Sequence, residues 1–264
     1  MLCCWHNLER VSYMLTGLVS VTFRKLSPPE IVRLAKEAGL DGIEWGGDIH
    51  CPPGDEQTAR DIDALTRENG LTTISYGSYY RAGSRGPFDQ VLSTAVTLKT
   101  QNIRIWAGDT ASAKVRADEW SSVVEDARRC ADMAAAHGIA VSFEYHADTL
   151  TDTLPTAVRL LSEVDRPNIF TYWQPPDGVS FEENLLSIRR LIEMNKLKNL
   201  HVFSWKGADR MPLADGNDSW RQYIREASAC SPALLLEFVK GDDPAQMVED
   251  ARTLIALRQS VGNK

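Results

Sequence analysis

The chain has 264 residues, of which 43% are hydrophobic and 25% are charged, the balance of a globular protein that can bury a large core. Its 29 basic and 36 acidic residues give a formal net charge of −7, whereas a nucleic-acid-binding protein usually carries a basic surplus. No apolar run approaches the roughly 18 residues of a membrane span, so neither nucleic acid nor a membrane is an expected partner.

The five cysteines form no recognisable framework. They are Cys3, Cys4, Cys51, Cys130 and Cys230, an odd number without a CxxC pair. This spacing argues against a set of disulfides and against a structural zinc site. We therefore expect reduced thiols in a cytoplasmic protein.

The first 13 residues, MLCCWHNLERVSY, lack the basic segment followed by an apolar stretch that is typical of a signal peptide. The first convincing strand begins after Met14. We interpret residues 1–13 as an N-terminal extension outside the fold, and residues 14–264 as one domain, because no linker rich in Pro, Gly or Ser divides them.

From Met14 onward the chain repeats one unit at intervals of roughly 30 residues. Each unit has a polar amphipathic stretch, a Gly or Asn breaker, and a short β-rich run that ends in an aromatic residue. The predicted strands are residues 18–23, 41–45, 71–76, 103–106, 139–145, 169–173, 200–205 and 234–238.

Helical patterns fill the segments between these strands. Residues 28–39 begin with proline and end with Gly39, and residues 120–138 place apolar side chains at helical spacing. Strict alternation of strand and helix predicts a parallel sheet, and eight units match a single (β/α)8 TIM barrel of the α/β class. A doubly wound open sheet is the alternative, disfavoured because no GxGxxG follows the first strand.

The reactive groups of such a barrel lie at the carboxyl ends of its strands. Aromatic rings around a polar centre suit a sugar, because C–H faces stack on the rings while hydroxyl groups take the hydrogen bonds. Each aromatic residue taken alone could instead cap the barrel core. The aromatic residues at the predicted strand ends are Trp45, Tyr76, Trp106, Tyr145, Trp173, Trp205 and Phe238.

Four polar residues end the fifth to eighth strands: Glu144, Gln174, His201 and Glu237. Two carboxylates, an imidazole and an amide oxygen suit Mn²⁺, Mg²⁺ or Co²⁺, with Zn²⁺ as a further candidate. Burying two carboxylates is costly without a cation or a strong hydrogen-bond network. We therefore predict a divalent metal site at these four residues, although each taken singly has an ordinary structural explanation.

The eightfold pattern, with Glu144, His201 and Glu237 in strands five, seven and eight, resembles the xylose isomerase-like TIM barrels. That family includes sugar phosphate isomerases/epimerases and ketose 3-epimerases, and the resemblance covers residues 14–260. It implies that these three residues hold the metal and that both glutamates are also the catalytic acid and base. The family's fourth ligand, an aspartate, falls at Gln174, which ligates without charge, so a lower metal affinity is expected.

The resemblance implies a divalent-metal-dependent isomerase or epimerase of a sugar or keto-sugar, phosphorylated or not. The metal would stabilise the enediolate formed when a proton next to the carbonyl leaves. One glutamate would remove the proton and the other would return it. With a leaving group in the β position the same groups would perform an elimination, so a dehydratase or lyase acting on a keto-sugar or polyol acid stays open.

Further substrate-binding residues are expected in the loops around this centre. Lys206 and Arg210 could hold a phosphate or carboxylate, although exposed loop cations are usually only solvated. Glu44, in contrast, is expected to be a hydrogen-bonding residue inside the barrel. The candidate substrate-binding residues are Trp45, His50, Tyr76, Tyr80, Trp106, His146, Trp173, Trp205, Lys206 and Arg210.

Two other hypotheses stay open. One is a non-catalytic sugar-binding barrel, with Gln174 marking the loss of chemistry. The other is the apurinic endonuclease branch of the same superfamily, which uses a multi-metal cluster; the five histidines and the acidic balance of this chain argue against it. The expected partner is a small-molecule carbohydrate, and the resemblance suggests a homodimer or tetramer.

Overall fold

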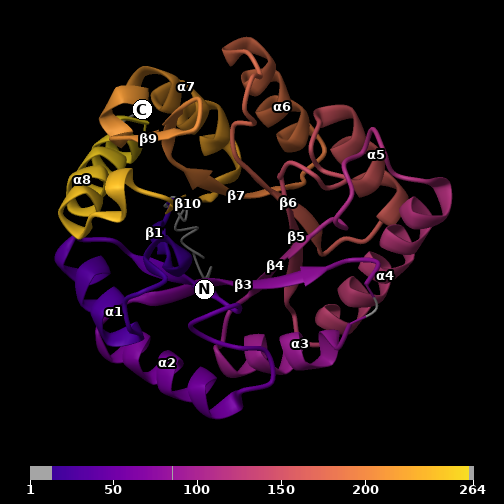
Figure 1. Ribbon diagram of the computed structural model, residues 1–264, viewed down its shortest axis with the longest axis horizontal. Helices are drawn as coiled ribbons and strands as arrows, with labels where there is room; N and C mark the ends of the chain where they lie inside the picture. Colours follow the sequence, from indigo (N-terminus) through magenta and orange to yellow (C-terminus); the bar gives the residue numbers. More distant parts are fainter. Residues whose placement is uncertain (1–13, 85, 262–264) are drawn as a thin grey trace, which may run out of the picture.

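Eight parallel strands form a closed barrel in the computed structural model, which describes residues 14–84 and 86–261 (Figure 1). This confirms the prediction of a single (β/α)8 barrel; the predicted extension, residues 1–13, lies outside the described residues. In barrel order the strands are β1 (Thr16–Val19), β10 (Ala233–Leu236), β7 (Leu197–Val202), β6 (Ile169–Trp173), β5 (Ala140–Glu144), β4 (Asn102–Trp106), β3 (Thr72–Arg81) and β2 (Gly42–Gly46).

A ring of helices covers the outside of the barrel (Figure 1). Serines at the starts of two of them form capping boxes with glutamates three residues later, Ser27 with Glu30 and Ser180 with Glu183. None of the described helices combines the length and the apolar character that crossing a membrane requires. The helices are α1 (Pro28–Glu37), α2 (Glu56–Glu68), α3 (Phe88–Thr97), α4 (Ala117–Ala135), α5 (Leu154–Val164), α6 (Phe181–Glu193), α7 (Asn217–Ala227) and α8 (Pro244–Val261).

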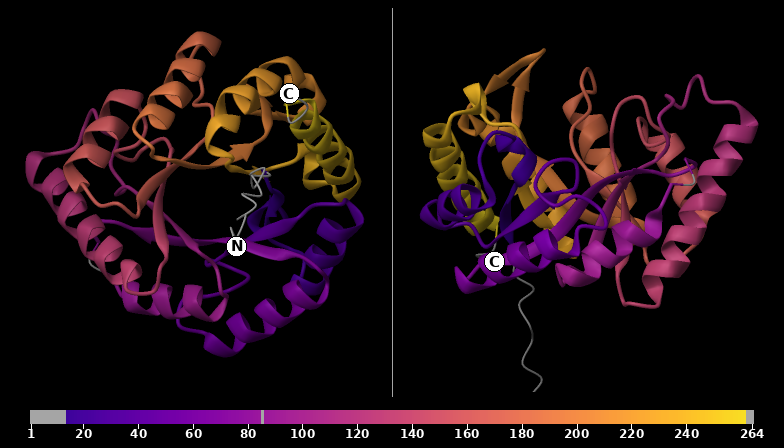
Figure 2. Two further views of the ribbon diagram at one scale, coloured as in Figure 1. Left: turned by 180° about the vertical axis from the view of Figure 1, so that it is seen from behind. Right: turned by 60° about the horizontal axis from the view of Figure 1, so that its bottom comes forward.

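Three predicted strands differ from the observed ones by three or more residues at one end, and the third of the predicted strands continues to Arg81. The first ends at Val19, and residues 20–23 form the 3₁₀ helix η1 (Ser20–Phe23). The seventh starts at Leu197 and ends at Val202, and the chain then forms β8 (Ser204–Lys206) and β9 (Asp209–Met211), an antiparallel pair outside the barrel. This hairpin stands above the barrel strands in the right-hand view of Figure 2. The β-rich pattern runs on through each change of direction, so it did not mark where the barrel strand ends.

Alternation of side chains along each strand divides the interior into two regions. One face packs against the helices, and the other fills the barrel. Inside, Tyr172 accepts hydrogen bonds from Asn102 (2.9 Å) and Asn199 (2.6 Å), and Ser142 donates to Asn102 (2.7 Å). This buried polar layer lies one inward position before the residues of the candidate site on the same strands.

Candidate active site

The next inward position on each of several strands carries an ionisable group. They are Glu44 on β2, Arg104 on β4, Glu144 on β5, His201 on β7 and Glu237 directly after β10. All five are buried, with at most 4% of their surface exposed. The expectation that Glu44 lies inside the barrel as a hydrogen-bonding residue is confirmed.

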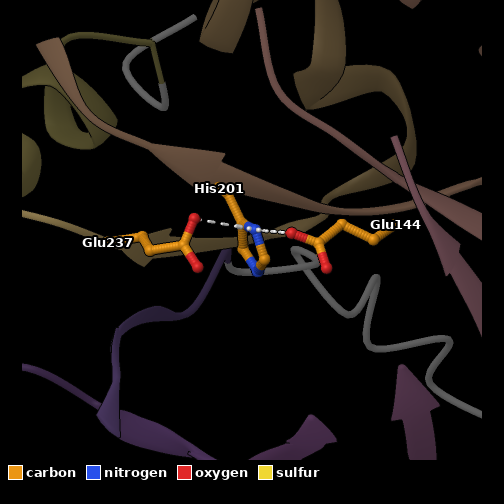
Figure 3. A group of neighbouring side chains, drawn as sticks. All are labelled: Glu144, His201 and Glu237. Carbon is orange, nitrogen blue, oxygen red and sulfur yellow. Dashed lines mark ion pairs between the residues drawn. The ribbon is translucent and has the colours of Figure 1, made fainter. Parts of the chain in front are cut away.

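His201 lies between the carboxylates of Glu144 and Glu237 (Figure 3). Its Nδ1 atom is 3.3 Å from Glu237 Oε2 and 3.6 Å from Glu144 Oε1. Gln174 contributes a third oxygen, with Oε1 at 3.2 Å from the same nitrogen, while its Nε2 donates to the carbonyl of Tyr145 at 2.8 Å. The four predicted metal ligands therefore converge on one point.

These residues fit a divalent cation. One ligand atom each from Glu144, His201 and Glu237 can be chosen so that all lie within 4.8 Å of one another. Three oxygen acceptors face a single imidazole nitrogen, an arrangement that needs either a proton or a metal ion at Nδ1. Carboxylate, amide and imidazole donors suit Mn²⁺, Mg²⁺ or Co²⁺, and the binding of such an ion stays a prediction.

Arg104 links two of the acidic residues. Its Nε donates to Glu44 at 2.7 Å and its Nη1 donates to Oε2 of Glu144. Gly77 leaves room for it, because a Cβ there would lie 2.6 Å from Arg104 Nη2. Trp106 also donates, through Nε1, to Oε2 of Glu144. One oxygen of Glu144 is thus held by two donors, while the other faces His201.

The charges of this cluster oppose the effect of burial. Burial raises the pKa of Glu44, but Arg104 and His201 lower it further, to about 2. In the same way burial raises the pKa of Glu144, yet Arg104 and His201 hold it well below its ordinary value. Burial lowers the pKa of His201, but Glu237, Glu144 and Glu44 raise it well above the ordinary range. In the absence of a metal ion, these contacts therefore favour the carboxylate forms of Glu44 and Glu144 and the protonated form of His201.

A cavity of about 800 Å³ opens above the cluster, and Glu144, Glu237 and Gln174 lie in its lining. Its walls are rich in aromatic rings. Trp106 stacks on His146 with ring centres 4.8 Å apart, and Trp205 lies between Phe203 (5.7 Å) and Phe238 (6.1 Å). The predicted substrate-binding residues Trp106, His146 and Trp205 therefore do line a cavity.

Three aromatic residues that were predicted to bind substrate point away from the cavity, toward the helices. Their assignment to substrate binding is wrong. The indole of Trp45 donates to Thr66 of α2 at 3.2 Å, and that of Trp173 donates to Ser187 of α6 at 2.7 Å. The hydroxyl of Tyr76 donates to the carbonyl of Cys51 at 2.8 Å. All three are fully buried, because each follows an inward residue on its strand and so faces the helices.

The predicted role of Tyr80 and His50 in substrate binding is also wrong, because both side chains are buried in contacts away from the cavity. Tyr80 donates to Asp126 of α4 at 2.7 Å. His50 contacts the hydroxyl of Ser20 at 2.9 Å and the carbonyl of Leu26 at 3.2 Å. Since Nε2 must donate to that carbonyl, Nδ1 accepts from Ser20, and His50 joins two loops.

The two predicted anion-binding cations do not line the cavity either. Lys206 is exposed on β8. Arg210 forms an ion pair with Asp242 and lies 4.7 Å from the ring centre of Phe238. The charge of Arg210 is thus paired, and that of Lys206 lies in an exposed position outside the lining of the cavity.

Sequence reasoning overlooked Arg104 and Tyr79, which both line the cavity. Arg104 interrupts the apolar run of β4 between Ile103 and Ile105, and a charge at such a position requires partners. That was an available signal. Tyr79 lies in β3 with φ of 58°, a left-handed conformation that alternation along a strand does not foresee.

Comparisons with known proteins agree with this architecture. The family described as "Xylose isomerase-like TIM barrel" matches residues 32–257. A 3-dehydroshikimate dehydratase of Bacillus anthracis is 29% identical over 244 residues, 80% of this chain and 85% of that protein.

Solved structures of enzymes share the fold. The crystal structure of a probable 3-DHS dehydratase from Bacillus anthracis has a TM-score of 0.74 and 24% identity, covering 92% of this chain and 98% of its own. A D-psicose 3-epimerase determined in the presence of D-fructose has a TM-score of 0.68 and 18% identity, covering 95% and 100%. With the family match spanning most of the chain and the closed eight-stranded barrel, this protein belongs to the xylose isomerase-like TIM barrel family.

Proposed function

We propose that the chain is a divalent-metal-dependent isomerase or epimerase of a sugar or keto-sugar. One observation carries the proposal: two carboxylates, Glu144 and Glu237, face the same imidazole nitrogen at 3.6 and 3.3 Å beneath a cavity with aromatic walls. The positions of the two carboxylates support a reaction in which they act on opposite sides of one bound substrate. A divalent cation held by Glu144, Gln174, His201 and Glu237 would polarise the substrate carbonyl and stabilise an enediolate.

The two glutamates have different surroundings. Oε2 of Glu144 accepts from Arg104 and Trp106, which fixes this carboxylate and favours its charged form. Glu237 contacts His201 through Oε2 and borders the cavity. In the proposed reaction one glutamate takes the proton from the carbon next to the carbonyl and the other returns one. Return to the opposite face gives an epimer, and return to the neighbouring carbon gives an isomer.

The aromatic walls support a carbohydrate as the substrate. Trp106, Trp205 and Phe238 line the cavity, and aromatic walls bind the C–H groups of a sugar ring. His146, stacked on Trp106 at 4.8 Å, adds a polar group beside these rings.

A dehydratase is the second candidate, favoured by the 29% identity with a 3-dehydroshikimate dehydratase. The chemistry begins with the same proton abstraction. The carbanion then expels a hydroxyl group from the β carbon, and the opposite glutamate, as the acid, supplies the proton that turns it into water. Both candidates therefore use the same pair of carboxylates.

Solvent-deuterium exchange tests the proposal. Protein with added Mn²⁺ would be incubated in D₂O with a panel of ketoses and, separately, with 3-dehydroshikimate, and followed by NMR. We expect deuterium at the carbon next to the carbonyl together with an epimer or isomer. Formation of 3,4-dihydroxybenzoate from 3-dehydroshikimate, without exchange into any ketose, would favour the dehydratase. A protein that binds sugars without exchange into any of these compounds would instead be a non-catalytic barrel.

A further inference from the structure

We infer that the substrate is uncharged, a polyhydroxylated ketone without a phosphate or carboxylate group. This inference rests on the proposed function, because it describes what the same cavity selects. It follows from the charges of the cavity lining, from the engagement of the nearby cations, and from the loops where a barrel of this kind usually holds phosphate.

The described lining of the cavity is strongly acidic. Arg104 is its only lysine or arginine. A bound divalent cation would offset two of the carboxylates and leave the rest near the opening, where Asp148 and Asp177 are exposed. An anionic substrate would approach against this field, whereas a neutral one would not. The acidic lining residues are Glu144, Asp148, Asp152, Asp177 and Glu237.

The charge of Arg104 is already matched. The guanidinium, 1% exposed, donates to both Glu44 and Glu144. Only Nη2 has no hydrogen-bond partner. Its two N–H groups lie beside Gly77 and next to two carboxylates, which an anion at this position would also meet.

Other arginines near the cavity are also engaged, each with an aromatic ring of the wall. Arg210 pairs with Asp242 and lies 4.7 Å from the ring centre of Phe238. Arg81 lies 3.9 Å from the ring centre of Trp106 and donates to a backbone carbonyl. These cations support the walls and do not face a ligand.

Arg24, in the loop after β1, is engaged in the same manner. It pairs with Asp48 and donates to the hydroxyl of Tyr79 at 2.9 Å. Tyr79 in turn borders the cavity. The cation therefore reaches the cavity only through a neutral phenol.

In (β/α)8 barrels, phosphate often binds in the loops after the last two strands, at a helix N-terminus. Here the loop after β10 carries Asp242 and Asp243, and Asp243 accepts from the backbone N–H of Ala245 at 2.9 Å. Asp218 lies in the first turn of α7. At the start of α8 a carboxylate of the chain itself thus occupies the position at which a phosphate would bind, and Asp218 adds negative charge at the start of α7.

Matched substrates test the inference in the exchange assay with Mn²⁺. The neutral ketoses D-fructose and D-psicose would be compared with fructose 6-phosphate and with 3-dehydroshikimate, a carboxylate. We expect kcat/KM for a neutral ketose to exceed that of either anion by about tenfold or more at low salt, with a smaller ratio at high salt. Faster exchange with fructose 6-phosphate than with both ketoses would overturn the inference and leave the proposed function standing. Turnover of 3-dehydroshikimate without exchange into any ketose would overturn both in favour of the dehydratase. Absence of exchange with every compound would overturn both.

A charge-reversal pair sharpens the test. Asp177→Lys places a cation at the cavity opening, while Glu68→Lys makes the same change on the exposed end of α2, at the opposite end of the barrel. We expect Asp177→Lys to shift the ratio of kcat/KM values about fivefold toward fructose 6-phosphate, and Glu68→Lys to leave the ratio unchanged. An unchanged ratio in Asp177→Lys, or an equal shift in both variants, would contradict the role of the acidic lining.

Discussion

Trp106 and Glu144 come from the neighbouring strands β4 and β5, and the indole of Trp106 donates to the same oxygen of Glu144 that accepts from Arg104. Because that oxygen is held twice, the other oxygen of Glu144 is the one that faces His201. Trp106 is in this sense a positioning residue for a proposed metal ligand and acid/base group.

Trp106→Phe removes the donor but keeps an aromatic ring against His146. Loss of a hydrogen bond to a charged acceptor is worth about 1.5–3 kcal/mol, so we expect kcat for exchange to fall roughly tenfold or more. Trp120→Phe is the matched control, because the Trp120 indole donates to Glu163 at 2.6 Å, between α4 and α5 and away from the cavity. Equal rates in Trp106→Phe and wild type would show that Trp106 does not position Glu144 for the reaction.

Replacing either glutamate tests the acid/base assignment. Glu144→Gln and Glu237→Gln keep the shape of the side chain but lose the carboxylate that accepts a proton. We expect both variants to lack turnover while circular dichroism and the unfolding transition show an intact fold. Turnover close to the wild-type rate in either one would refute its catalytic role.

Metal binding is expected to stabilise the folded protein. A ligand at a concentration 100 times its Kd adds about 2.7 kcal/mol, which for a domain of this size raises Tm by about 5–10 °C. Thermal melts with EDTA and then with Mn²⁺ measure this shift. His201→Ala should lose most of it, because it removes the nitrogen at the centre of the cluster. No shift with Mn²⁺, Mg²⁺ or Co²⁺ would contradict the metal prediction.

The repeat of strand and helix was sufficient to predict the barrel, because each strand begins a new buried run after a helix. The direction of individual side chains was harder. Glu44 and Trp45 are adjacent on β2, so only one can face the interior; placing Glu44 inside should have excluded Trp45 from the cavity. Reading aromatic residues at strand ends without this alternation led to the errors at Tyr76 and Trp173.

The predicted metal ligands lie together because they occupy inward positions on β5, β7 and the ends of β6 and β10, a relationship that alternation can supply. Their roles stay predictions. The hairpin β8–β9 and the turned conformation of Tyr79 could not be predicted in this manner, since both depend on contacts between loops. Arg210, placed on this hairpin, pairs with Asp242 32 residues away in the chain.

The pair of Glu44 and Arg104 predicts a dependence of stability on pH. The pKa of Glu44 is about 2 in the folded protein, below its ordinary value of 4.5. A carboxyl with a lowered pKa stabilises the fold fully above its unfolded pKa, and this contribution is lost as the pH falls toward 2. This difference between the folded and the ordinary pKa corresponds to roughly 3 kcal/mol in the free energy of unfolding.

Glu44→Gln removes this titration, and its uncharged amide leaves Arg104 with a single ionic partner, Glu144. Urea unfolding in EDTA at pH 7, 5, 4 and 3 should therefore show the variant less stable than wild type by a few kcal/mol at pH 7. The gap should narrow below pH 4.5, because unfolded wild type then takes up a proton at Glu44 that the folded protein, with a Glu44 pKa of about 2, does not bind. A gap that stays constant from pH 7 to pH 3 would show that Glu44 stabilises the barrel through packing, independent of its charge.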